Sequence, residues 1–295
     1  MYFIFAIMLG IGLIGKTETL EPHVKRIRKN PNVNIVGKAS IGTDYILSSF
    51  HHTIPEINKI ELIERVDVIM ADNSSKLTFP LLCDIVKKSK HVFAVEYLNL
   101  TVDECALLAK LADESGSVIQ ITNPLYFSPA IQWFNRHLST PAYIDISCIS
   151  AETVTDSTLI SLLMMLLGTT GISPKKVSAV TFRSQQADSN FNNVRLEFGD
   201  ASVVNLNYGN MPKFNKFKIK AYSSDRFVTL DFSNETYLNN NIPIITDKEV
   251  NAVDELEYFV NTILKKHKQQ SNIEDYLTVL HTVQKINKKI SQFVL

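Results

Sequence analysis

Residues 1–16 read MYFIFAIMLGIGLIGK, and this stretch decides the class of fold. It carries no charge before Lys16 and joins an apolar run, residues 3–9, to the glycine pattern GIGLIG at residues 10–15. A secretory signal begins with positive charge and ends in a small-residue cleavage site, and a membrane-spanning helix needs roughly 18 or more apolar residues. The run has neither property. We therefore expect residues 3–9 to form a short strand that a parallel sheet buries on both faces.

The residues after the glycines favour a strand–turn–helix unit. A helical pattern covers residues 16–29, the turn Asn30-Pro31-Asn32 follows, and residues 33–37 form a second apolar strand. In such a unit the pattern G-x-G-x-x-G provides a tight turn, room for a pyrophosphate beside the backbone, and close packing of the helix on the strand. A tight turn without a ligand is the alternative. The pattern predicts a dinucleotide-binding loop formed by Gly10, Gly12, Leu13, Ile14 and Gly15.

The end of the second strand indicates which dinucleotide is preferred. An acidic residue there would bind the adenosine ribose of NAD, but the sequence reads Gly37-Lys38-Ala39-Ser40 and has no acid before Asp44. Lys38 and Ser40 are suited to a 2′-phosphate, which favours NADP over NAD. An ordinary solvated lysine at a strand end is an equal alternative for Lys38.

Strands and helices alternate through the rest of the first half. Strands are expected at residues 67–71, 90–96 and 118–121, and helices at residues 54–66, 79–88 and 101–115. This alternation predicts a parallel, doubly wound α/β domain over residues 1–122. Asn73 and Ser74 follow a buried strand, so we expect them to line the cofactor crevice at the carboxyl ends of the strands.

The second half has the pattern of another domain, residues 123–295. Six stretches rich in β-branched and aromatic residues predict an open, mostly antiparallel sheet. They cover residues 143–150, 176–183, 193–198, 202–208, 216–222 and 226–232. Two amphipathic helices, at residues 250–266 and 273–292, close the chain, and the last is a candidate to pack back on the first domain.

Composition narrows the class of protein. Thirty Lys and Arg balance thirty Asp and Glu, whereas a broad nucleic-acid-binding face needs an excess of basic residues. The three cysteines are isolated in apolar stretches, which is typical of reduced thiols in the cytoplasm. No Cys or His cluster has metal-ligand spacing, so we expect no metal site.

Three segments together carry a resemblance to a known family. They are GIGLIG at residues 10–15, DNSS at residues 72–75 and KHVFAVEYLNLTVDECALLAKLADESG at residues 90–116. In order and spacing they resemble the Gfo/Idh/MocA family, the relatives of glucose–fructose oxidoreductase and inositol dehydrogenase. The resemblance implies a Rossmann-type domain followed by an α+β domain whose open sheet pairs with a second subunit. It also implies NADP- or NAD-dependent hydride transfer to or from a small substrate such as a sugar or polyol.

The same resemblance implies positions for the site. Glu96 would lie at the cofactor, and substrate would bind near Tyr97, Asn123 and Tyr126. Packing of an aromatic ring is the alternative for Tyr126. We expect no nucleic-acid or membrane partner.

Two departures from the family pattern put the chemistry in doubt. Tyr97 stands where the family has a catalytic lysine, although biliverdin reductases of the same broader fold resemble the chain in having tyrosine there. The family's catalytic histidine falls on Thr158, and its second aspartate on Ser161, which leaves Asp156 as the remaining carboxylate. We therefore predict an oxidoreductase in which Tyr97 donates the proton and Asp156 assists, and an ordinary residue of a helix N-terminus is an equal alternative for Asp156. The alternative function is a non-catalytic nucleotide- or metabolite-binding protein that keeps the fold.

Overall fold

The chain forms two compact units in a computed structural model. The structure describes residues 8–41, 54–73, 77–138, 141–152, 154–184, 189–244, 253–265 and 269–292. The first unit joins Met1–Thr122 to Asp254–Leu277, and the second joins Asn123–Val253 to Thr278–Leu295. Within the described ranges, no helix combines the length and hydropathy needed to span a membrane.

The first unit is built on a five-stranded parallel sheet, which confirms the expected doubly wound class. Its strands, in spatial order, are β2 (Val33–Ile41), β1 (Leu9–Lys16), β3 (Val68–Ala71), β4 (His91–Ala94) and β5 (Ile119–Ile121). β1 lies inside the sheet, between β2 and β3. Most of the run expected as the first strand, residues 3–9, lies outside the described residues, and the observed strand begins at Leu9.

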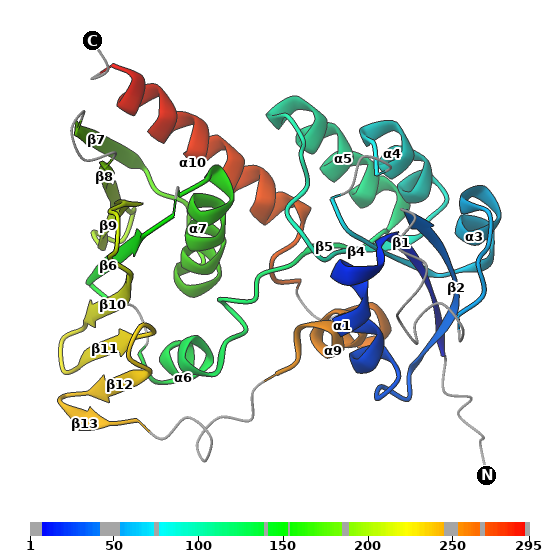
Figure 1. Ribbon diagram of the computed structural model, residues 1–295, viewed down its shortest axis with the longest axis horizontal. Coiled ribbons are helices and arrows are strands. Elements are labelled where there is room, and N and C mark those ends of the chain that lie inside the picture. The colour runs from blue at the N-terminus through cyan, green and yellow to red at the C-terminus, as the bar shows by residue number, and fades with distance from the viewer. Residues whose placement is uncertain are drawn as a thin grey trace. The chain divides into compact units, whose positions relative to one another are not determined.

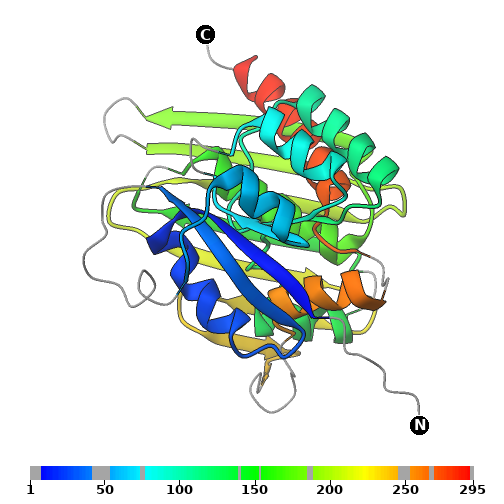
Figure 2. The ribbon, with the colours of Figure 1, turned by 90° about the vertical axis from the view of Figure 1, so that its right-hand side faces the viewer.

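Helices cover both faces of this sheet. They are α1 (Thr17–Ile27), α3 (Lys59–Arg65), α4 (Phe79–Lys87), α5 (Val102–Ser115) and α9 (Glu255–Lys265). Figures 1 and 2 show α1 and α9 together on one face and α3, α4 and α5 on the other. A capping box begins α5, because Thr101 Oγ1 accepts the Glu104 N–H at 3.2 Å and the Glu104 carboxylate accepts the Thr101 N–H at 2.8 Å.

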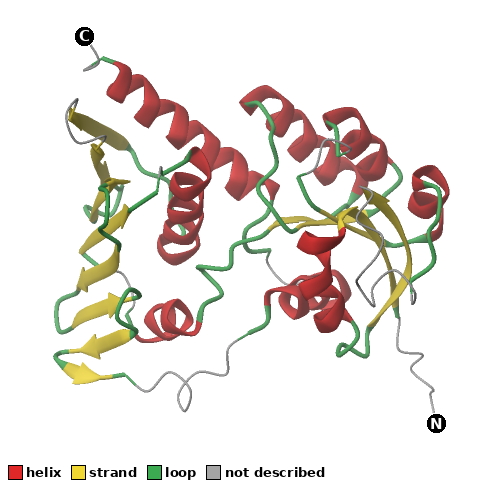
Figure 3. Cartoon of the chain, viewed as in Figure 1, coloured by secondary structure: helices red, strands yellow, loops and turns green. Residues whose placement is uncertain are grey.

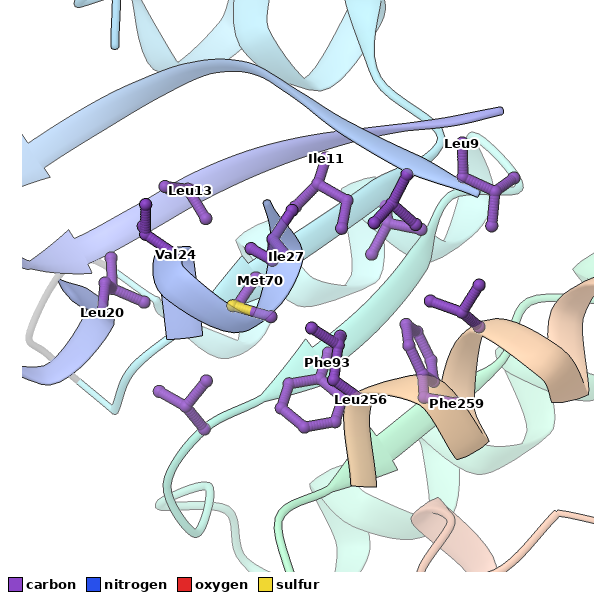
Figure 4. Close-up of a cluster of buried hydrophobic side chains, with 14 of the residues drawn as sticks. Leu9, Ile11, Leu13, Leu20, Val24, Ile27, Met70, Phe93, Leu256 and Phe259 are labelled. Atoms are coloured by element: carbon purple, nitrogen blue, oxygen red, sulfur yellow. The ribbon is translucent and has the colours of Figure 1, made fainter. Parts of the chain in front are cut away.

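Helix α9 belongs to the first unit, which corrects the placement of all residues after 122 in a second domain. Its apolar side chains Leu256, Phe259 and Val260 are at most 1% exposed and join the core under β1, β3 and β4 (Figure 4). The rings of Phe93 and Phe259 lie 5.3 Å apart. The physical reason is that α1 alone leaves part of this face of the sheet open, and α9 buries it.

The second unit is built on an eight-stranded sheet, the expected open and mostly antiparallel one. Only β6 and β9 pair in parallel among its described strands. In spatial order these are β13 (Ile242–Pro243), β12 (Thr236–Asn239), β11 (Phe227–Asp231), β10 (Lys216–Tyr222), β6 (Tyr143–Ser150), β9 (Val203–Asn210), β8 (Ser189–Glu197) and β7 (Lys176–Ser184).

Helices cover one face of this second sheet. They are α6 (Pro129–His137), α7 (Asp156–Thr170) and the part of α10 (Ile273–Ser291) that belongs to this unit. Figure 3 shows no described helix on the other face. We call that other face the open face, and its residues alternate along each strand with the buried ones.

The place of α9 makes a prediction about stability. Leu256→Ala should lower the free energy of unfolding of the first unit by about 2–5 kcal/mol, because it leaves a cavity in the core. Leu107→Ala on α5 is the matched control; that side chain is 48% exposed, and its removal should cost within about 0.5 kcal/mol. Urea denaturation with hydrogen exchange on the first sheet measures both. Equal small effects would show that α9 does not complete this core.

Candidate functional site at the carboxyl end of the first sheet

The glycine pattern is part of β1 and does not form the loop that follows it. Gly10 pairs with Asn34, and Gly12 pairs with Gly37 on one side and Ile69 on the other. A Cβ on Gly12 would lie 2.9 Å from Leu62 Cγ of α3, and a Cβ on Gly10 would lie 3.0 Å from a methyl carbon of Val36. These two glycines therefore allow close packing within the sheet and against α3.

The expected binding loop is consequently misplaced for four of its five residues. Leu13 and Ile14 are at most 1% exposed and pair in the sheet, like Gly10 and Gly12. A loop that binds phosphate must present free backbone amides to a ligand, and residues inside a two-sided sheet do not. Only Gly15 lies where β1 turns into α1.

An aspartate covers the turn at Gly15. Asp72, the residue after β3, is 1% exposed, and its Oδ2 accepts the Lys16 N–H at 2.6 Å. Its own N–H donates to the Ile14 carbonyl at 3.2 Å. Gly15 has a φ of +146°, and a Cβ at this residue would overlap the Asp72 carboxylate. The glycine therefore provides room for a side chain of the protein itself.

The residues after Gly15 also differ from a dinucleotide fingerprint. Counted from Gly15, the second and third glycine positions hold Thr17 and Leu20. Leu20 is 1% exposed and belongs to the core, and Glu18 adds a carboxylate to the first turn of α1. A bound diphosphate would have to share the positive helix N-terminus with Asp72 and Glu18. The residues at this turn therefore do not fit the diphosphate of NAD or NADP.

Lys38 is neither the expected phosphate ligand nor a solvated lysine at a strand end. It is 2% exposed within β2, its N–H donates to the Pro55 carbonyl at 2.9 Å, and its Nζ lies 3.8 Å from the Glu56 carboxylate. Burial lowers the pKa of Lys38, and the charge of Glu56 partly opposes that shift. Ser40 lies in β2 opposite Gly15, with its side chain outside the described residues, as is the whole of Ser74.

The ends of β3 and β4 are joined by polar bonds. The Glu96 Oε2 accepts the Asn73 N–H at 3.0 Å, and the Asn73 Oδ1 accepts the Asn99 N–H at 3.3 Å. Asn73 and Glu96 are exposed, so the structure does bring together two residues that the sequence assigned to the crevice. The Asn73 amide, like that of Lys16, donates to a carboxylate of the chain.

Tyr97 packs in an aromatic pair. Its ring is parallel to that of Tyr276, with an interplanar angle of 6° and centroids 6.4 Å apart. Tyr276 is 1% exposed, and its hydroxyl donates to the Leu98 carbonyl at 2.6 Å. Burial raises the pKa of Tyr276 well above its usual value. The half-buried Tyr97 ring is thus held against a fixed neighbour within the first unit.

The remaining predicted residues belong to the second unit. Asn123 is fully buried, and its Oδ1 accepts the Tyr126 N–H at 3.3 Å. The Tyr126 ring covers Gly168 of α7 so closely that a Cβ there would lie 2.6 Å from it, which favours the packing interpretation of Tyr126. Asp156 is exposed in the first turn of α7. Burial, together with the charge of Asp156, raises the pKa of Tyr208 to about 12.

Sequence reasoning missed the role of Asp72. It placed the stretch of polar residues after β3 at the crevice, yet it did not predict that one carboxylate would close the turn of β1. The available signal was a charged residue directly after a fully apolar strand. Within the described ranges, no group of three or more His, Cys, Asp or Glu side chains is arranged to hold a metal ion.

Comparison with known proteins gives matches in structure alone. No protein-family model and no curated protein sequence matches the chain. UDP-N-acetylglucosamine 3-dehydrogenase from Acidithiobacillus ferrooxidans is 17% identical, with a TM-score of 0.82 over 98% of this chain and 100% of that one. A putative myo-inositol dehydrogenase from Sinorhizobium meliloti is 13% identical, with a TM-score of 0.75 over 97% and 98% of the two chains.

A third match was solved with a cofactor. Biliverdin reductase from Synechocystis, in complex with biliverdin and NADP+, is 14% identical, with a TM-score of 0.72 over 96% of this chain and 99% of that one. The expected likeness to Gfo/Idh/MocA-type dehydrogenases is therefore confirmed as a likeness of fold, over nearly the full length.

The packing of Gly12 generates a prediction. Gly12→Ala should lower the free energy of unfolding by about 1–3 kcal/mol, because the new Cβ meets Leu62. Combined with Leu62→Ala, it should cost less than the sum of the two single changes by about 0.5–3 kcal/mol. Urea denaturation of the four proteins measures this coupling. Leu256→Ala, on the opposite face of the sheet, is the control: its destabilisation and that of Gly12→Ala should add in the double variant. If the effects of Gly12→Ala and Leu62→Ala also added, the packing role of Gly12 would be contradicted.

Proposed function

We propose that the protein is a non-catalytic binding protein built on an oxidoreductase fold, and that it does not use NAD or NADP for hydride transfer. The observation that carries the proposal is the bond from the Lys16 N–H to the buried Asp72 carboxylate, at 2.6 Å. It engages an amide of the turn where proteins with G-x-G-x-x-G hold a diphosphate, and it brings a negative charge there.

The residues expected to move protons support the same proposal. A positioned general acid or base contributes about a hundredfold to ten-thousandfold in rate. Tyr97 replaces the lysine and packs on Tyr276, Thr158 replaces the histidine, and Asp156 is an exposed residue of a helix N-terminus. Such an exposed carboxylate stabilises the helix through its dipole and has an ordinary structural role.

The second candidate is an NAD(P)-dependent oxidoreductase acting on a sugar, polyol or similar small molecule. The likeness of fold to a UDP-N-acetylglucosamine 3-dehydrogenase and to an NADP+ complex of biliverdin reductase favours it. In that case Tyr97 is the proton donor. The two candidates differ in whether a dinucleotide binds at all.

A titration separates the two candidates. Purified protein is titrated with NADH and with NADPH, followed by nicotinamide fluorescence and calorimetry. We expect no saturable binding up to millimolar concentration, because Asp72 already engages the amide of the turn. Micromolar binding would overturn the proposal, and turnover that is abolished in Tyr97→Phe would then assign the proton donor.

The open face of the second sheet supports a proposal about a partner, a second copy of this chain. Val180, Phe182 and Tyr222 lie on this face and are 50%, 64% and 41% exposed. Asn193 donates from its side chain to Asn207 at 2.6 Å on the same face. Charges of both signs, those of Lys176, Arg195 and Glu197, lie at its β7–β8 edge. A face that combines exposed apolar side chains with polar groups and charges of both signs can pair with a copy of itself, as a two-fold symmetric interface requires.

Light scattering after size exclusion tests this partner. We expect a dimer at micromolar concentration and a shift toward monomer in Phe182→Glu, because the charge would be buried unpaired in the interface. Ile60→Glu is the control, since Ile60 is 67% exposed on α3 of the first unit, and it should not change the association. A monomer at all concentrations would contradict the proposal that a second copy of the chain binds the open face.

A further inference from the structure

Two backbone amides at the carboxyl end of the first sheet donate to carboxylates of the chain itself. The Lys16 N–H, after β1, donates to Asp72, and the Asn73 N–H, after β3, donates to Glu96. This is the edge at which open α/β sheets bind their ligands. At this edge, two backbone N–H groups that could bind an anionic ligand therefore already donate to carboxylates of the protein.

Asp72 is the better placed of the two carboxylates. It is 1% exposed, while Glu96 is exposed. Its side chain lies against Gly15, and its backbone N–H donates to the Ile14 carbonyl. Both the side chain and the backbone of Asp72 therefore contact the end of β1. A carboxylate that accepts a backbone N–H makes a charge-assisted bond, the type that a bound phosphate would make.

We propose that the buried Asp72 carboxylate takes the place of a ligand's phosphate at the turn between β1 and α1, and that it keeps the Lys16 amide of this turn closed to anions. The inference rests on the proposed function and adds its physical cause. Position 15 needs a glycine in this view, because the carboxylate occupies the space that a Cβ would fill. Removal of the carboxylate leaves the Lys16 amide and the first turn of α1 to an external anion.

The chain offers a matched control in Asp67. Its Oδ2 accepts the Gly10 N–H at 2.8 Å, so it forms the same kind of bond to the same strand, but near the opposite end. Asp72→Ser and Asp67→Ser each remove one charge and one acceptor of a β1 amide. Only Asp72→Ser removes them at the carboxyl end of the sheet.

The experiment measures binding of inorganic pyrophosphate and of ADP by calorimetry, together with the exchange rate of the Lys16 amide by NMR. The wild type and Asp67→Ser should bind neither probe at millimolar concentration. Asp72→Ser should bind both at least about tenfold more tightly, in line with the loss and replacement of one charged hydrogen bond. Its Lys16 amide should also exchange faster, and pyrophosphate should slow that exchange again.

The outcomes separate this inference from the proposed function. Folded Asp72→Ser that binds the probes no better than Asp67→Ser would overturn the inference, while a wild type that binds no NADH would leave the proposed function standing. Micromolar binding of NADH by the wild type would overturn both. Should Asp72→Ser fail to fold, Asp72→Asn keeps the shape of the side chain and one acceptor oxygen but removes its charge; binding of pyrophosphate no tighter than in the wild type would then contradict the inference.

Discussion

Strand β1 has neighbours on both edges and is buried on both faces, and the rest of the first unit depends on this constraint. Its residues from Leu9 to Gly15 are all buried. A strand in that position has no room for large side chains on the face where α3 lies close, and Gly12 meets Leu62 there. Glycine in a strand interior weakens the strand locally, so its presence is explained by the close approach of another element.

This constraint also explains why the sequence predicted a phosphate-binding loop at residues 10–15, which in fact belong to β1. The apolar residues 3–9 and the glycines at 10–15 together match a strand followed by a phosphate-binding turn. A fully buried strand that contains glycine has no periodicity to distinguish it from such a turn. The alternation of strands and helices, the helix at residues 101–115 and the two-sheet organisation were predictable because each depends on residues close together in the sequence.

The candidate site was less predictable, because its contacts join residues far apart in the chain. Lys16 and Asp72 are 56 positions apart, and Asn73 and Glu96 are 23 apart. The sequence pattern placed Asn73, and the family resemblance placed Glu96, at the cofactor edge of the sheet, but neither predicts which backbone amide a side chain will bond. Lys38 shows the same limit, since residues 55–57 pair with it along the edge of β2.

The return of α9 to the first unit has a consequence for how the chain folds during synthesis. The polypeptide leaves the first unit after Thr122 and comes back at Asp254. Until residues 254–277 have left the ribosome, the face of the first sheet that α9 covers exposes Phe93 and its apolar neighbours. The amino-terminal unit therefore cannot finish folding before the second sheet has been made, in contrast to the usual order in which domains fold one after another from the amino terminus. A chaperone that shields apolar surface would be needed longest at this face.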